Sequence, residues 1–176
     1  MAGRRPKFEP SQADLNRTPE EWDERARNIL INQLTRSSKT KHQLAQLLEK
    51  KFVPQEIAQA LLERFTEVGL IDDAAYARAF AHDKRLTRGL SKSAIKRELS
   101  QAGVDQELIL YAIEPIDSQA ELDLAIRLVE KRWSSVAKLE RDARYRRLSG
   151  YLGRRGFAGP TISSAIHDVA SSESAR

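Results

Sequence analysis

Two adjacent aspartates, Asp72 and Asp73, lie between a glycine and a run rich in alanine and aromatic residues. Paired carboxylates can transfer protons or bind a metal ion when further polar ligands converge on them. The rest of the sequence does not supply such ligands, because its three histidines lie far apart and it contains no cysteine. We therefore interpret Asp72 as the N-cap of a helix and expect the positive end of the helix dipole to stabilise Asp73. No metal site is predicted.

Motifs for other kinds of catalysis are also missing from the sequence. It has no glycine-rich loop that could bind a phosphate and no nucleophile elbow. We predict that the protein is not an enzyme, that it has no catalytic residues and that it uses no cofactor.

The composition favours an all-α protein. Of 176 residues, 31% are charged and only 6% are aromatic, and apolar and polar residues nowhere alternate as they do in a strand. The net charge of +5 and the isoelectric point of about 9.6 favour a polyanionic partner such as nucleic acid. No apolar stretch approaches the roughly 20 residues of a membrane span, and the N-terminus has no apolar segment typical of a secretory signal. We therefore expect a cytoplasmic protein without a membrane role.

Capping sequences mark where helices begin. Thr18 stands three residues before Glu21, and Thr40 stands three residues before Gln43. A hydroxyl followed at this spacing by a glutamate or glutamine is typical of a capping box. Thr18 and Thr40, like Asp72, are therefore predicted to be structural helix caps.

Three stretches of the chain, at 34–57, 86–108 and 146–166, resemble one another. Each reads as helix, tight turn and helix, follows a connecting helix, and recurs after about fifty residues. One such unit is too small to bury a full core, so we predict that neighbouring units stack into an elongated, curved array. The principal aligned apolar positions are Leu44/Ile95/Leu148, Leu48/Leu99/Leu152, Val53/Val104/Phe157 and Leu61/Ala112/Ala165.

The predicted domain organisation is three tandem three-helix repeats, each resembling a helix-turn-helix. The repeats are placed at residues 18–69, 70–115 and 116–169. Polar tails at 1–17 and 170–176 are predicted to be disordered. Because a repeat array needs no second copy to complete its fold, we expect a monomer.

Two sequence blocks, "GLIDDAAYA" at 69–77 and "RGLSKSAIKRELSQAGV" at 88–104, resemble the RecX family of bacterial recombination regulators. The likeness extends more weakly from about residue 24 to 169. One departure is the first turn, "EKKFV", which has Lys51 where the later turns have Gly103 and Gly156. We expect that turn to be looser or differently shaped.

The resemblance implies a fold of tandem three-helix units and a function in DNA recombination and repair. It implies binding to the RecA recombinase, usually as the RecA–DNA filament, and restraint of its ATPase and strand-exchange activities. It further implies that the protein lies in the helical groove of the filament. No catalytic residue belongs to this function, so none is transferred to the present sequence.

The segment 141–155 is the most basic part of the sequence, with six arginines and one acid. At helical spacing, one face is predicted to be buried through Tyr145, Leu148, Ser149 and Leu152. Guanidinium groups can bind phosphates or acidic protein groups equally well. The adjacent outward stripe is predicted to bind DNA or protein through Arg144, Arg147, Tyr151 and Arg154, with Arg155 beside it. A second, smaller candidate patch consists of Arg85, Arg88, Lys92, Lys96 and Arg97.

Two other functions remain open at this point. A helix-turn-helix transcription regulator would place the second helix of a repeat in the major groove, but these helices carry acids such as Glu56, Glu63 and Glu107, which would repel phosphates. An all-helical protein-interaction scaffold is the other alternative. For the regulator of RecA we expect weak DNA binding, to single or double strands, with little sequence preference.

Overall fold

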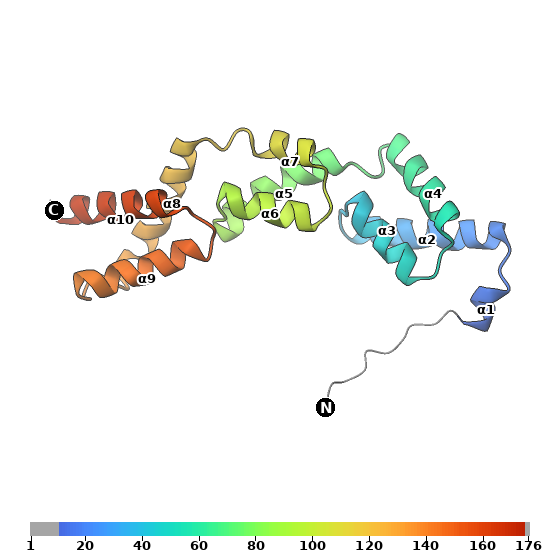
Figure 1. Ribbon diagram of the computed structural model, residues 1–176, viewed down its shortest axis with the longest axis horizontal. Coiled ribbons are helices and arrows are strands. Elements are labelled where there is room, and N and C mark those ends of the chain that lie inside the picture. The colour runs from blue at the N-terminus through green and yellow to red at the C-terminus, as the bar shows by residue number, and fades with distance from the viewer. Residues whose placement is uncertain (1–10, 175–176) are drawn as a thin grey trace, which may run out of the picture. The chain divides into compact units, whose positions relative to one another are not determined.

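The computed structural model describes residues 11–174, and this part of the chain contains ten helices and no strand. The predicted all-α class is confirmed. The described residues form two compact units, which are treated separately below. The first unit contains the residues up to Tyr76 together with Ala102–Val104, and the second contains Ala77–Gln101 and the residues from Asp105 onward. Figure 1 shows the order of the helices.

The first unit is built on a bundle of three helices. These are α2 (Pro19–Arg36), α3 (Lys41–Lys50) and α4 (Gln55–Glu67). Thr18 and Thr40 are the N-caps of α2 and α3, and each forms a capping box with Glu21 or Gln43. Because the apolar residues recur at helical spacing, each helix turns one face inward. The buried side chains of this core include Trp22, Leu30, Leu44, Leu48 and Phe65.

A short helix precedes the bundle, in a segment that was predicted to be a disordered tail. Helix α1 (Gln12–Leu15) begins at Ser11, whose hydroxyl accepts the Asp14 amide while the Asp14 carboxylate accepts the Ser11 amide. The Asp14 carboxylate also accepts the Arg17 Nε at 3.2 Å. These local bonds order residues 12–15 without an apolar stripe. Residues 1–10 of the predicted tail lie outside the described residues.

The second unit contains most of α5 (Asp73–Arg88), whose first residues up to Tyr76 belong to the first unit. Helix α6 packs against α7, and α10 packs along both α8 and α9. A buried cluster joins the last three helices through side chains such as Val129, Leu148, Leu152 and Ala165. The bounds are α6 (Lys92–Gln101), α7 (Gln106–Ile113), α8 (Ser118–Trp133), α9 (Arg141–Gly153) and α10 (Gly159–Ser174).

Helix α10 continues to Ser174, although a disordered tail was predicted to begin at residue 170. The last buried apolar residue is Val169, and Ala170 is half-buried. The chain then stays helical for about one more turn without a buried apolar position, which the apolar spacing alone did not predict. Residues 175 and 176 lie outside the described residues.

The turn after the first helix of each repeat has a residue in the left-handed region. Gly103 and Gly156 have φ values of 76° and 86°, and in the first repeat the residue is Phe52, with a φ of 61°. Phe52, rather than Lys51, is therefore the counterpart of the two glycines. The Val53 amide bonds to the Leu48 carbonyl as the Phe157 amide bonds to that of Leu152, so these turns share one shape. The expectation of a looser first turn is wrong.

None of the helices in the described residues combines the length and apolar character of a membrane span.

Candidate partner-binding surface

Asp72 and Asp73 bind the amino ends of two different helices. The Asp72 carboxylate accepts the Ala75 amide at 2.8 Å, in the position of an N-cap for α5. The Asp73 carboxylate instead accepts the backbone amide of Lys41, the first residue of α3, at 2.9 Å. The described part of the chain contains no group of three or more histidine, cysteine, aspartate or glutamate residues arranged to hold a metal ion. Both aspartates thus have a structural use, and Asp73 has one that its spacing did not predict.

Around Lys41, residues of the first unit form what we call the first joint. It consists of Thr40–His42, Asp73 and the turn Ala102–Gly103. Thr40 is fully buried, and its hydroxyl donates to the Ala102 carbonyl at 2.6 Å. A Cβ atom on Gly103 would lie 2.2 Å from the His42 Cγ, so only glycine fits at this contact. The joint fixes the start of α3 against a turn some sixty residues away in the sequence.

The second unit repeats this arrangement in the second joint, formed by Ser91–Ala94, Glu121 and the turn Arg155–Gly156. Ser91 is fully buried, and its backbone amide donates to the Arg155 carbonyl at 3.0 Å. Both oxygens of Glu121 lie 3.1 Å from the backbone nitrogen of Lys92, the first residue of α6. A Cβ on Gly156 would lie 2.6 Å from the Ser91 Oγ. Each joint therefore combines a buried hydroxyl, a carboxylate and a glycine turn.

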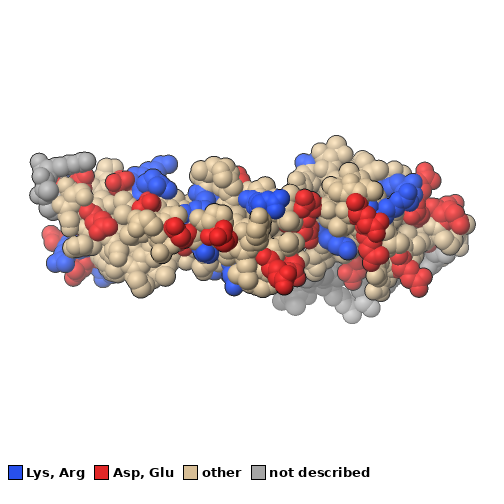
Figure 2. Space-filling model, turned by 90° about the horizontal axis from the view of Figure 1, so that it is seen from above, with Lys and Arg blue, Asp and Glu red and all other residues tan. Residues whose placement is uncertain are grey.

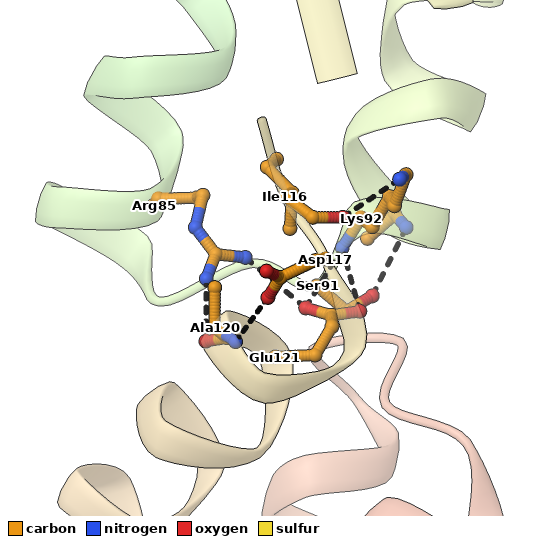
Figure 3. A network of polar contacts seen from close by, with 8 residues as sticks. Arg85, Ser91, Lys92, Ile116, Asp117, Ala120 and Glu121 are labelled. Carbon is orange, nitrogen blue, oxygen red and sulfur yellow. Dashed lines mark hydrogen bonds and ion pairs between the residues drawn. The ribbon is translucent and has the colours of Figure 1, made fainter. Parts of the chain in front are cut away.

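Two of the basic residues predicted to lie at the surface, Arg85 and Lys92, instead form hydrogen bonds at the second joint. Arg85 donates to the Glu121 carboxylate at 3.1 Å and to the Ala120 carbonyl at 2.9 Å. The Lys92 ammonium donates to the Ile116 carbonyl at 2.7 Å. Figure 3 shows Glu121 between Arg85 and the start of α6. These contacts give Arg85 and Lys92 a structural role.

The other three residues of the middle patch lie at the surface. Arg88 is exposed and pairs with Glu98 at 3.0 Å, whereas Lys96 and Arg97 are exposed and form no ion pair within residues 11–174. Of the five predicted residues, Arg85 and Lys92 are thus bound within the second joint, whereas Arg88, Lys96 and Arg97 are exposed. Figure 2 shows basic and acidic side chains interspersed on the face it presents.

The arginines of the third repeat are stacked on aromatic rings. The Arg144 guanidinium lies 4.8 Å from the centre of the Trp133 ring. Tyr151 is in contact with two guanidinium groups, those of Arg132 at 5.1 Å and Arg155 at 3.9 Å. A stacked guanidinium keeps its N–H groups available at the edge of the plane while its orientation is held. The predicted stripe already placed Tyr151 among the arginines, but it did not include Arg132 or Trp133 as stacking partners.

Arg132 and Trp133 were not predicted as site residues. Both lie at the end of α8. In the sequence, an arginine next to a tryptophan at the end of a helix is only weak evidence for a binding site. It gains meaning only when α8 and α9 are known to pack together, as they do here.

The inward face of α9 differs from the prediction at one end. Leu148 and Leu152 are fully buried, as expected, but Tyr145 is 43% exposed. Its hydroxyl lies 3.0 Å from the Ser163 Oγ on α10. Arg147 and Arg154 are exposed, whereas Arg144 and Arg155 are half-buried. Arg155 also donates to the carbonyls of Arg88 and Tyr151.

These features define a class of protein: an all-helical repeat protein that has glycine-turn joints and an arginine–aromatic surface suited to contact with a partner. Known proteins share this architecture. Residues 72–113 match the family model described as RecX, second three-helix domain, and residues 119–166 match RecX, third three-helix domain. The predicted fold class of tandem three-helix units is confirmed, with the second and third units matched by these models.

Curated relatives agree with the family models. The chain is 39% identical over 148 residues to "Regulatory protein RecX" of Streptomyces coelicolor, which covers 84% of this chain and 79% of the relative. It is 37% identical over 140 residues to the protein of the same name from Thermobifida fusca, covering 80% and 76% of the two chains. This chain belongs to the RecX family of regulatory proteins.

Solved structures show the same fold at lower identity. The crystal structure of RecX from Lactobacillus salivarius matches with a TM-score of 0.76 at 17% identity, covering 86% of this chain and 98% of the other. A second crystal structure of regulatory protein RecX matches with a TM-score of 0.73 at 19% identity, covering 91% and 79%.

Proposed function

We propose that this protein regulates the RecA recombinase by binding the RecA–DNA filament in its helical groove, where it restrains ATP hydrolysis and strand exchange. Membership of the RecX family supports this function. The stacked arginines of the third repeat, together with the exposed Arg147 of α9 and Arg154 at its C-cap, are the observation that carries it. The protein acts on recombination and repair in the cytoplasm, without chemistry of its own.

The stacking of the arginines on aromatic rings favours a role in binding a nucleoprotein filament over the role of a solvated helix face. Cation–π contacts hold Arg144 and Arg132 at fixed positions, so less side-chain entropy is lost when they bind a phosphate or a carboxylate. Arg147 and Arg154 add charge that is free to form new contacts. The phosphates of DNA and the acidic groups of RecA can each accept hydrogen bonds from these guanidinium groups.

The transcription-regulator alternative is less well supported. On α4, the exposed residues include Glu56, Gln59 and Glu63. On α7, Asp105 is the N-cap, and the exposed side chains Leu110 and Tyr111 are large and apolar in character. The glutamines at the starts of α4 and α7, Gln55 and Gln106, are each followed by an acid, Glu56 or Glu107, which would repel the phosphates that flank a major groove.

The test is the DNA-dependent ATPase of RecA, measured while this protein is titrated in. The triple variant Arg144→Glu/Arg147→Glu/Arg154→Glu is expected to abolish inhibition. The double variant Arg147→Glu/Arg154→Glu is expected to weaken it without disturbing the Arg144–Trp133 stack. The matched control is Arg64→Glu/Arg78→Glu, which reverses two exposed arginines on other helices. This variant should inhibit the RecA ATPase as the wild type does. Full inhibition by a triple variant with unchanged helical circular dichroism would remove the proposal.

A further inference from the structure

Helix α7 exposes two large apolar side chains at adjacent positions. Leu110 is 50% exposed and Tyr111 is 68% exposed, whereas the other side of the helix is buried through Ile109, Ala112 and Ile113. The helix packs against α6 within the second unit (Figure 1). Six of its eight residues are apolar or aromatic, so both its inward and its outward side are apolar. A helix of this composition is normally covered on both sides.

The other two repeats do not share this exposed apolar pair. The alignment of the repeats pairs Ala112 of α7 with Leu61 of α4 and Ala165 of α10. The counterparts of Leu110 and Tyr111 are therefore the exposed residues Gln59 and Ala60 in the first repeat and Ser163 and Ser164 in the third. Because both of those repeats form their helices with small or polar side chains at these positions, the fold does not require large apolar ones.

Two glutamates flank the apolar pair on the same face of α7. Glu107 stands three residues before Leu110, and Glu114 stands three residues after Tyr111. At helical spacing these four positions share one face, and we call them the α7 stripe. Both glutamates are exposed, and neither forms an ion pair within residues 11–174. Their carboxylates are therefore available to bind cationic groups beside the apolar pair.

The charge of the α7 stripe favours a basic protein segment as its occupant. Nucleic acid would bring phosphates close to Glu107 and Glu114, which would repel them. A second copy that used the same stripe in a symmetric dimer would place these glutamates against their own counterparts, which is unfavourable for the same reason. The basic surface of a second copy, around Arg147 and Arg154, is the surface by which the proposed function binds the filament.

We propose that the α7 stripe binds a segment of the protein partner in which apolar side chains are flanked by lysine or arginine. This inference rests on the proposed function, in which the partner is RecA within its filament. Leu110 and Tyr111 supply the apolar centre of the contact, and Glu107 and Glu114 supply its charged rim, as is typical of protein–protein interfaces. The middle repeat thus contacts RecA itself, while the arginine surface of the third repeat is left to bind phosphates or acids.

Replacement of the apolar pair by its counterparts from the first repeat tests the centre of the contact. Leu110→Gln/Tyr111→Ala alters only exposed side chains, so helical circular dichroism and the affinity for DNA should not change. The concentration needed for half-maximal inhibition of the RecA ATPase should rise about tenfold, as expected when an aromatic anchor of an interface is truncated. The matched control is Ile31→Gln on α2, which removes a 46% exposed apolar side chain and should inhibit as the wild type does. Unchanged inhibition by the α7 variant would overturn the inference.

Charge reversal separates a basic protein segment from nucleic acid by the sign of its effect. Glu107→Lys/Glu114→Lys makes the net charge more positive, which would strengthen inhibition if the stripe faced phosphates. Against a basic RecA segment it should instead raise the half-maximal inhibitory concentration about tenfold, as expected for lost charge pairs. The matched control is Glu56→Lys/Glu63→Lys at the corresponding exposed positions of α4, which should inhibit at least as well as the wild type. Equal or stronger inhibition by the α7 variant would overturn the inference.

Photo-crosslinking identifies the occupant. Tyr111 is replaced by p-benzoylphenylalanine in the full chain, which is then irradiated with RecA filaments on single-stranded DNA. We expect a crosslink to a RecA segment that contains lysine or arginine, and the same group in place of Ile31 should not crosslink to that segment. A crosslink from position 111 to DNA, to a second copy or to a RecA segment without basic residues would overturn the inference. If the wild type does not inhibit RecA, the proposed function fails and this inference with it; if it inhibits but position 111 does not crosslink to RecA, only this inference fails.

Discussion

The carboxylate of Glu121 receives the backbone N–H of Lys92, with both of its oxygens 3.1 Å from the nitrogen. Glu121 also pairs with Arg85, so one half-buried carboxylate binds the start of α6 and a side chain of α5. The loss of its charge should weaken both interactions, because hydrogen bonds to charged groups contribute more than neutral ones.

Glu121→Gln is therefore expected to lower the free energy of unfolding by about 1–2 kcal/mol, since the amide keeps the shape but not the charge. Urea unfolding followed by circular dichroism measures this change. The matched control is Glu130→Gln on the exposed face of the same helix, which should lie within about 0.5 kcal/mol of the wild type. Equal effects from the two substitutions would contradict a joint role for Glu121.

Substitution of the joint glycines should be more costly. Gly103→Ala and Gly156→Ala each place a Cβ in the left-handed region and against a neighbour, at 2.2 Å from His42 or 2.6 Å from Ser91. We expect a loss of about 2–4 kcal/mol for each, from backbone strain together with overpacking. Thermal or urea unfolding gives the value.

Gly69 provides the control for these substitutions. Its φ is also positive, at 73°, but nothing lies within 4 Å of the Cβ that an alanine would add. Gly69→Ala should therefore lower the free energy of unfolding through backbone strain alone, by about 1–2 kcal/mol. A loss at Gly103 or Gly156 no larger than that at Gly69 would show that the turns do not dock as tightly as the distances indicate.

Most of the fold could be predicted from the sequence because its signals are local. Thr18, Thr40 and Asp72 bond to amides three residues further along the chain, so the cap and its partner are visible together in the sequence. The same signature at Ser11 and Asp14 was missed, because no apolar periodicity follows it.

The site was less predictable because it depends on which helices pack together. Arg85 and Lys92 have the spacing of a surface patch, yet their partners Glu121 and Ile116 lie on a segment about thirty residues away. Helical periodicity indicates which face of a helix is polar, but it does not tell what opposes that face. For the same reason the stacking of Arg144 on Trp133 could not be anticipated.

Helix α1 should lose its capping box only at an unusually low pH. Hydrogen bonds from the Ser11 hydroxyl and amide, followed by the one from Arg17, lower the pKa of Asp14 from 3.8 to about 2. Because the folded-state pKa is depressed, the stabilisation is complete above pH 3.8 and is lost as the pH falls through 2. Carbon-detected NMR titration of the Asp14 carboxyl should give this pKa, and Ser11→Ala should raise it. A pKa near 3.8 in the wild type would show that α1 is not held by this capping box.

Salt should weaken DNA binding, and the steepness of this dependence should be proportional to the number of arginines that contact phosphates. If Arg144, Arg147 and Arg154 each contact one phosphate, log Kobs against log salt concentration should have a slope of about −2.7 on duplex DNA. Arg147→Glu/Arg154→Glu should reduce the slope by about 1.8, whereas the Arg64→Glu/Arg78→Glu control should leave it unchanged. Fluorescence anisotropy with labelled duplexes of several sequences measures both slope and preference. Because the stacked arginines offer phosphate contacts rather than base contacts, affinities should be similar among the duplexes, and a strongly preferred palindrome would instead favour a transcription regulator.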